Sequence, residues 1–170
     1  MGSRVIIGID NGATGTIALV GLFNPIFMET PVKKGQDYTV KVQNVSRIDW
    51  ARLKELLEDW KSKADEQETP IFAYVERPYT GRFPKTVAIA ARAYEATIII
   101  LEQLGIGYEA VDSGHWQKGM LPKGTKTSVK LKKASRDVGC RLFPMHAELI
   151  KKHTDADGLL IAEYYRREHG

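Results

Sequence analysis

The sequence predicts an α/β protein with a mixed five-stranded sheet and helices on both faces, and two observations lead to this prediction. Three short β-rich runs, residues 4–10, 15–22 and 25–32, follow one another closely, as antiparallel neighbours do. Helical stretches then alternate with single strands at 70–76 and 107–111. Such βα units give parallel pairing. We therefore expect antiparallel strands first, then parallel strands, with helices covering both faces.

The first two strands are joined by a short turn that contains glycine. The segment RVIIGIDNGATGTIALV, residues 4–20, holds one apolar run that ends at Asp10, then NGATG, then a second apolar run. Glycine suits a turn in which φ is positive. The run PIFMETPV (25–32) predicts a third strand, and the polar stretch 33–45 predicts an exposed loop.

Helices are predicted where apolar residues recur every three or four positions. Ser46 is expected to begin the first helix, because Asp49 follows three residues later as in a capping box. Pro84 fits the first turn of a long second helix that ends before Gly105. Two further helices are expected: a basic one over about 127–142 and a C-terminal one from about 155.

Length and composition are those of an ordinary globular protein. The chain has 170 residues, 43% of them hydrophobic and 27% charged. We therefore expect one domain over residues 1–170. The sequence has no apolar stretch of about 18 residues and no signal-peptide layout, so we expect a cytoplasmic protein with no membrane partner. A single cysteine, Cys140, excludes an internal disulfide framework.

Positive charge is concentrated in the second half of the chain. Residues 113–153 contain ten lysines and arginines against two carboxylates, whereas the net charge of the whole chain is only +4. An asymmetry of this kind favours a polyanionic partner.

Two carboxylates share one setting, at the end of an apolar strand and before a glycine- or proline-containing loop. They are Asp10 and Glu76. If the two strands are neighbours, both side chains emerge at one edge of the sheet, where open α/β sheets bind ligands. Asp155 and Asp157 stand at the start of the last helix. Taken singly, Asp10 could form a turn, Asp155 could cap that helix and Asp157 could stabilise its first turn.

Carboxylates that converge from separate segments repel one another unless divalent cations neutralise them. Mg²⁺ prefers such oxygen ligands and accepts phosphate oxygens, and we expect Mn²⁺ to substitute for it. Two ions roughly 3.5–4 Å apart could activate a water and stabilise the leaving oxygen of a phosphodiester. The following residues are therefore interpreted as catalytic metal ligands: Asp10, Glu76, Asp155 and Asp157.

These motifs resemble those of the RuvC-like Holliday junction resolvases, particularly phage-type members, within the ribonuclease H-like superfamily. IGIDNGATGTIAL resembles the family's first two strands, YVERPY the segment with its glutamate, and DADGLLIAEYYRR its closing helix. The resemblance covers nearly the whole chain. It implies a ribonuclease H-like fold and a Mg²⁺-dependent endonuclease that resolves four-way DNA junctions by paired symmetric nicks. It also implies Asp10, Glu76 and Asp157 as metal ligands, and action in a bacterial host cell if the protein is phage-encoded.

One position departs from the family pattern. The family often has an acid or a histidine three residues before its final aspartate, where this chain has Thr154. His153 lies four residues before Asp157 and would share its helix face. Asp155 would instead reach the site as a non-helical cap residue. Both stay candidates for the fourth metal ligand, and Asp155 is slightly favoured.

The loop RPYTGRFPK, residues 77–85, directly follows Glu76 and carries cations and aromatic residues. The family resemblance implies that an aromatic residue here stacks on bases opened at the crossover, and such stacking is worth roughly 1–3 kcal/mol per base. Tyr79, Arg82 and Phe83 are therefore candidate DNA contacts. Of the two aromatics, Phe83 is the one more expected to pack into the core instead.

The lysines of the basic segment are candidate contacts to DNA phosphates, which give affinity without sequence information. A lysine near the metal ions could also stabilise charge in the transition state, and Lys126 or Lys130 is expected there. The candidate phosphate contacts are Lys118, Lys123, Lys126, Lys130, Lys132 and Lys133.

The helix predicted over 86–104 has more apolar residues than a single core-facing stripe needs. It is therefore either central in the protein or covered by a partner. A two-fold homodimer would suit a four-way junction, because symmetric nicks need two active sites related by symmetry.

Two other classes of function compete with a junction-cleaving nuclease. A nuclease-like fold could bind branched nucleic acid without cutting it. The DNGATGT loop is also compatible with the phosphate-binding loop of sugar kinases and actin-like ATPases. Those enzymes bind nucleotide between two domains and are much longer than this chain, which makes them the weaker alternative.

Overall fold

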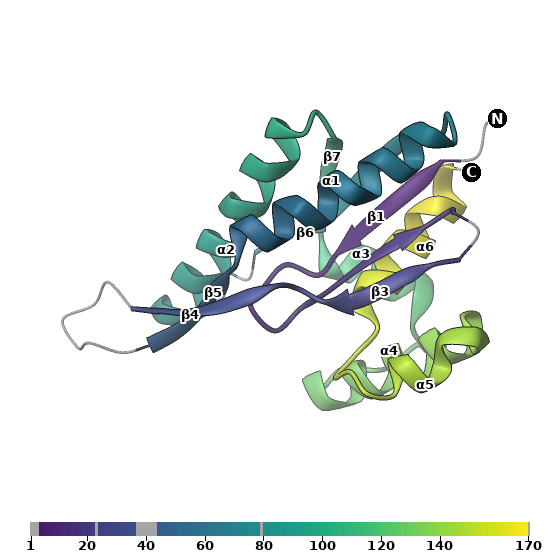
Figure 1. The fold of residues 1–170 in the computed structure, drawn as a ribbon. Coiled ribbons are helices and arrows are strands. Elements are labelled where there is room, and N and C mark those ends of the chain that lie inside the picture. The colour runs from purple at the N-terminus through teal and green to yellow at the C-terminus, as the bar shows by residue number, and fades with distance from the viewer. Residues whose placement is uncertain (1–3, 23, 37–43, 79, 170) are drawn as a thin grey trace.

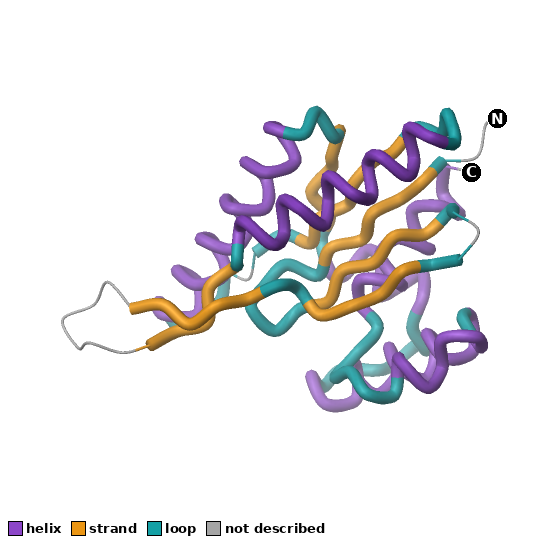
Figure 2. Tube along the Cα trace, viewed as in Figure 1, coloured by secondary structure: helices purple, strands orange, loops and turns teal. Residues whose placement is uncertain are grey.

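The computed structural model describes residues 4–22, 24–36, 44–78 and 80–169. A central sheet lies between two layers of helices (Figures 1 and 2). In the described part of the chain the main sheet has five strands, in which β1 (Val5–Ile9) is antiparallel to β2 (Thr16–Val20) and parallel to β6 (Ile71–Glu76). The predicted mixed sheet is confirmed. In spatial order its strands are β3 (Ile26–Glu29), β2 (Thr16–Val20), β1 (Val5–Ile9), β6 (Ile71–Glu76) and β7 (Gly107–Val111).

Helices cover both faces of this sheet, as predicted, and each layer has its own hydrophobic core. One core lies between the sheet and two long helices, α1 (Trp50–Glu66) and α2 (Pro84–Gln103). The second core lies on the opposite face, where α6 packs directly on β1 and β2. The elements on that side are α3 (Ser113–Met120), α4 (Ser128–Leu142), a 3₁₀ turn (Pro144–His146), α5 (Ala147–Ile150) and α6 (Asp157–His169).

The alternation of side chains along β1 decides toward which face of the sheet Asp10, at the end of the strand, is directed. Ile7 and Ile9 join the core beneath α1 and α2, whereas Ile6 joins the core on the side of α6. Gly8 lies on that second face, and a Cβ there would lie 2.1 Å from the carbonyl oxygen of Gly158. Only glycine therefore allows α6 to lie against β1. The alternation turns Asp10, the next even-numbered residue, toward α6.

The stretch 33–45 was predicted to be an exposed loop, and this prediction is wrong for its described residues. They form a two-stranded antiparallel sheet, hereafter the basic hairpin, from β4 (Val32–Gln36) and β5 (Asn44–Ile48). Figure 1 shows it projecting from the body beside α2. The predicted strand 25–32 is correspondingly divided, because β3 ends at Glu29 and β4 begins at Val32.

The prediction that Ser46 begins a helix is also wrong. Ser46 lies in β5, where its hydroxyl accepts a hydrogen bond from Lys34 Nζ at 3.0 Å. The helix begins at Trp50, because the carbonyl of Asp49 accepts the first helical bond, from Leu53 N. The predicted start of α2 at Pro84 is confirmed. Its predicted end is confirmed as well, and Gly105 follows with φ of +64°.

In the second half of the chain the structure differs from the predicted helices in two ways. The last helix begins at Asp157 rather than about Asp155. Helix α3 was not predicted, because the segment SGHWQKGM is short and rich in polar and glycine residues. Among the described residues, no helix is long and apolar enough to span a membrane.

Candidate metal centre

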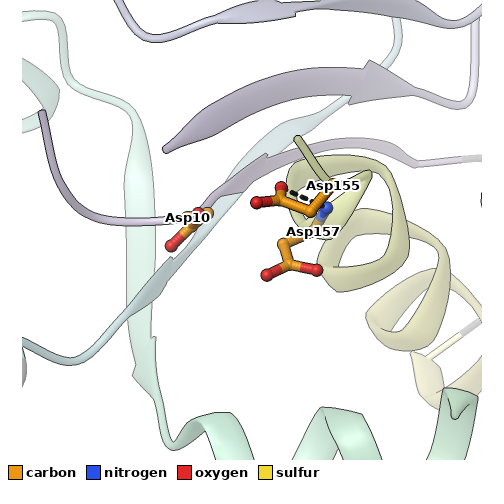
Figure 3. A group of neighbouring side chains, drawn as sticks. All are labelled: Asp10, Asp155 and Asp157. Carbon is orange, nitrogen blue, oxygen red and sulfur yellow. Dashed lines mark hydrogen bonds between the residues drawn. The ribbon is translucent and has the colours of Figure 1, made fainter. Parts of the chain in front are cut away.

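Three aspartates meet at the end of β1. Each of Asp10, Asp155 and Asp157 offers a carboxylate oxygen, and these oxygens lie within 4.8 Å of one another. Figure 3 shows Asp10 at the end of its strand, facing the two aspartates at the start of α6. The chain thus brings together residues that lie more than 140 positions apart in the sequence.

The turn after β1 is held tightly enough to fix Asp10. The Asp10 N–H donates to the carbonyl of Thr16 at 3.0 Å, and the Gly15 N–H donates to Gly12 at 3.2 Å. A Cβ on Gly15 would lie 2.1 Å from the carbonyl oxygen of Asp10. The glycines that the sequence shows after Asp10 therefore allow the chain to return directly into β2.

The start of α6 is joined to β2 through one hydroxyl. Thr16 Oγ1 donates to Asp155 Oδ1 at 3.3 Å and accepts a bond from the Gly158 N–H at 3.0 Å. Asp155 Oδ1 also accepts from the Asp157 N–H at 3.2 Å, the bond dashed in Figure 3. Asp155 is only 1% exposed, so its carboxylate is fixed by bonds within the protein.

Helix α4 supplies two side chains to the same group. Ser135 Oγ donates to Asp157 Oδ1 and accepts from the Ala156 N–H at 3.0 Å. Lys132 Nζ lies 3.3 Å from Asp155 Oδ2. We expected Lys126 or Lys130 near the metal site, and the lysine that contacts a carboxylate of this group is Lys132.

Burial and mutual repulsion raise the pKa values of the converging carboxyls. Desolvation, with added repulsion from Glu76 and Asp155, raises the pKa of Asp10 from 3.8 to about 8. Desolvation and the charges of Asp155 and Asp10 likewise raise the pKa of Asp157. The positive charge of Lys132 opposes both shifts without cancelling them. The pocket therefore disfavours the charged forms of Asp10 and Asp157, and Lys132 alone does not offset this effect.

These pKa values predict how the stability of the metal-free protein changes with pH. The pKa values of these carboxyls are higher in the folded protein than in the unfolded protein. Their contribution to the free energy of unfolding is therefore fully present below about pH 4 and is lost as pH rises through about 8. We expect the melting temperature in EDTA to fall between about pH 5.5 and about pH 8.5. A melting temperature that rises over this interval would contradict the raised pKa values.

Glu76 lies beside the three aspartates, although it is not one of the three whose oxygens fall within 4.8 Å. Desolvation raises its pKa from 4.5 to about 7, with contributions from Asp157 and Asp155. Trp116 Nε1 donates to Glu76 Oε2 at 2.8 Å and opposes this increase. Trp116 is fully buried in α3, so the indole holds this carboxylate in one orientation.

Replacing Trp116 by phenylalanine should raise the pKa of Glu76 further. The substitution keeps a buried aromatic ring but removes the donor, and a bond to a charged group is worth about 1.5–3 kcal/mol, or roughly one pKa unit or more. NMR titration of the Glu76 carboxyl in metal-free protein measures the effect. Trp60→Phe is the matched control, because Trp60 is equally buried in the core beneath α1. An equal change in both variants would exclude a specific role for the Trp116 bond.

The structure places His153 apart from the group of three aspartates. Its ring meets Phe27 edge-on at 4.7 Å between centroids, and its Nδ1 lies 3.4 Å from Glu29 Oε1. The imidazole therefore packs against β3. Of the two candidates for the fourth ligand, Asp155 is the one that the fold brings to Asp10 and Asp157.

The loop after Glu76 is described only in part. Arg82 is exposed, and Tyr79 lies outside the described residues. Phe83 is 67% exposed, so the alternative that it packs into the core is wrong, and its role as a DNA contact stays a prediction. The ring stands on the surface at the entrance to α2.

The predicted phosphate contacts other than Lys132 are exposed on α3, α4 and the segment between them. Lys118 and Lys123 line a cavity of about 600 Å³ beside Leu121 and Leu131. Lys130 and Lys133 line a second one, of about 240 Å³, together with Arg141. Lys126 is exposed in the segment that joins α3 and α4.

Sequence reasoning missed three side chains that position the carboxylates: Thr16, Trp116 and Ser135. Lys132 and Ser135 are three residues apart on a helix and so share a face. This spacing could therefore have predicted that Lys132 and Ser135 face the same site. The sequence around Thr16 and around Trp116 has no pattern that predicts their roles, because each bonds to a carboxylate far away in the sequence.

No family model and no curated protein sequence matches this chain. Its structure is similar to that of Thermus thermophilus RuvC in complex with a Holliday junction substrate. The TM-score is 0.51 at 14% sequence identity, and the match covers 98% of this chain and 96% of that one. A second structure of Thermus thermophilus RuvC matches with a TM-score of 0.47 at 15% identity, covering 97% of this chain and 96% of the other. The strand order and the first of these matches together show that the chain has a RuvC-like, ribonuclease H-like fold.

Proposed function

We propose that this chain is a metal-dependent endonuclease that resolves four-way DNA junctions. The observation that carries the proposal is the convergence of Asp10, Asp155 and Asp157 within 4.8 Å, at the end of the first strand of a RuvC-like fold. The similar structure from Thermus thermophilus holds a Holliday junction substrate, which supports branched DNA as the class of substrate.

The residues present fit a divalent cation. The donors are carboxylate oxygens, which Mg²⁺ and Mn²⁺ prefer. They are desolvated and repel one another, and an ion bound among them would relieve both penalties. When bound, Mg²⁺ would supply an activated water and stabilise charge on the leaving oxygen of a phosphodiester. We assign the ligands to Asp10, Glu76, Asp155 and Asp157.

The remaining residues of the centre hold these ligands in place. Thr16 and Ser135 each bond to one aspartate of the pair at the start of α6, and Trp116 bonds to Glu76. Lys132 balances part of the charge at Asp155. Positioning of this kind is the protein's main contribution at such a site, because the ligands must keep a fixed geometry during the reaction.

The exposed cations of α3 and α4 provide a surface for the DNA backbone. Lys118, Lys130 and Lys133 lie in the same layer as α6, which begins with Asp157, one of the proposed ligands. Arg82 and Phe83 stand on the loop that follows Glu76, where Phe83 is available to stack on an unpaired base. These residues would fix the position of the DNA, and its branched shape would select the substrate.

A homodimer is part of the proposal. Ile99, on α2, is 44% exposed, and Ala88 and Ala91 are exposed on the same helix. These exposed apolar side chains share a helix face with exposed Arg92 and Glu95, and a mixed surface of this kind supports an interface between two copies. Two copies related by a two-fold axis would place one metal centre on each of two opposing strands of a junction.

The test is cleavage of a labelled four-way junction in Mg²⁺, with EDTA and the Asp157→Asn variant as controls. Paired symmetric nicks that disappear in both controls support the proposal. Tight junction binding without cleavage in Mg²⁺ or Mn²⁺ would instead favour a binding protein with a nuclease-like fold. If the purified protein is monomeric and cuts RNA–DNA hybrids better than junctions, the proposal that it is a nuclease stands and the proposal that it resolves junctions is rejected.

A further inference from the structure

The basic hairpin is a strongly charged surface that the metal centre does not use. Its described strands carry three cations, Lys33, Lys34 and Arg47, and no carboxylate. Lys33 and Lys34 are exposed, and Trp50, which follows the hairpin, is 57% exposed. Lys33 Nζ lies 6.0 Å from the centre of the Trp50 ring. The hairpin thus combines cations with an exposed aromatic ring.

Two of these cations oppose each other across the strands. Lys33 is the direct partner of Arg47 in the register of β4 and β5, and directly opposed like charges destabilise a strand pair. The Arg47 side chain lies across Gly35, where a Cβ would come within 2.8 Å of Arg47 Cδ. Lys34 lies on the other face and bonds to Ser46.

The hairpin is fixed to the part of the chain that carries Asp10. The Thr30 N–H, before β4, donates to the Gly15 carbonyl at 3.0 Å, and the Asp49 N–H donates to Pro31 at 2.9 Å. Asn11 Nδ2 donates to the Ala90 carbonyl of α2 at 3.3 Å. The turn after Asp10 is therefore bonded both to the base of the hairpin and to α2.

A cavity of about 90 Å³ lies where the hairpin meets α2. Arg47 and Arg92 border it, together with Ser46, Trp50 and Ala13 from the turn after Asp10. Its remaining lining is apolar: Val45, Ile48, Ile89, Ala93 and Ala96. Guanidinium groups recognise phosphate oxygens, and two arginines border this cavity. The cavity lies in the layer of α2, whereas the lysines of α4 lie in the opposite layer.

We propose that the basic hairpin and this cavity bind the phosphate backbone of a nucleic-acid duplex, on the side of the metal centre away from α4. The inference rests on the proposed function and extends it with a second contact surface. The positive charge of this surface indicates which partner it binds. Two copies of the chain meeting at this face would bring cations against cations, whereas a nucleic-acid backbone is complementary to it.

The test is binding of a four-way junction and of a linear duplex in Ca²⁺, measured at several salt concentrations. In the Lys33→Gln/Arg47→Gln variant we expect affinity to fall about tenfold at moderate salt, and the slope of log K against log salt to decrease by about 1.8. The matched control is Lys61→Gln/Lys63→Gln on α1, which changes the charge equally at exposed i,i+4 pairs. We expect its affinity and slope to be unchanged. Lys33→Arg/Arg47→Lys keeps the charge and should retain binding.

Each remaining outcome has a distinct meaning. If wild type binds the junction and the hairpin variant binds equally at every salt concentration, this inference is overturned and the proposed function stands. If wild type binds neither junction nor duplex, the proposed function fails as well. If the hairpin variant dissociates a dimer in sedimentation experiments, the hairpin is an interface between copies, and the inference is overturned. Thermal denaturation of every variant checks that it is folded.

Discussion

Replacing Asp10 by asparagine should abolish metal-dependent cleavage and, at the same time, make the metal-free protein more resistant to heat. Cleavage should fall about a thousandfold or more, because a charged ligand is removed from the centre. Stability should rise because the charged form of Asp10 is disfavoured by burial and by Glu76 and Asp155. At about pH 8 we expect a gain of roughly 2 kcal/mol, or about 4–8 °C in melting temperature.

The measurement pairs a junction-cleavage assay with thermal denaturation in EDTA and in Mg²⁺. Mg²⁺ should stabilise wild type and have little effect on the variant. Asp112→Asn is the control, because Asp112 is an exposed aspartate that pairs with Arg77 outside the group. A metal-free variant that melts below wild type would show that Asp10 is not held under repulsion.

Replacing Gly8 by alanine should destabilise the fold strongly. The new Cβ would lie 2.1 Å from the Gly158 carbonyl oxygen and 2.6 Å from Ala162 N, so α6 must move away from β1. Overpacking of this kind costs about 3 kcal/mol, or about 6–12 °C in melting temperature. Because α6 begins with Asp157, Mg²⁺ should also stabilise the variant less than wild type.

Chemical and thermal denaturation with and without Mg²⁺ measure both effects. Gly114→Ala is the control, because no atom lies within 4 Å of a Cβ at that position of α3. It should stabilise the protein by about 0.5–1 kcal/mol. Similar stability for Gly8→Ala and Gly114→Ala would mean that α6 is not seated on β1 as tightly as described.

The places of Asp10 and Glu76 follow from the sequence because strands alternate strictly. Each of these carboxylates ends a run of buried strand residues, and the parallel pairing of Ile9 with Val75 puts both at one edge of the sheet. Two-residue alternation then turns both toward the same face. The pattern of the two strands is therefore sufficient to predict that these carboxylates lie together.

The places of Asp155 and His153 could not be read in the same way. Helical periodicity favours His153, four residues before Asp157, but the helix begins only at Asp157, so the periodicity does not apply to the residues before it. Which of the two residues turns inward depends on Thr16 and Lys132, which contact Asp155 from β2 and α4. Contacts over such distances in sequence leave no local pattern.

The basic hairpin was not predicted from the sequence, for a different reason. VKKGQ and NVSRI are short, polar and poor in strict alternation, so they resemble loop sequences. What stabilises them is packing against α2, since Val45 and Ile48 are buried beside its residues. Tertiary burial here overrides weak local preference.

The hydroxyl of Thr16 joins the second strand to the last helix, so the proposed metal centre is completed late in synthesis. Asp10 and Glu76 leave the ribosome early, whereas Asp155 and Asp157 follow after nearly all of the other described elements. A nascent chain that ends before Asp155 lacks two of the four proposed ligands. On the proposed function, such a chain has no complete metal centre with which to cut nucleic acid while it is still attached to the ribosome, itself an RNA-rich particle. On the proposed function, the position of the last helix in the sequence delays cleavage until all strands of the main sheet have been synthesised.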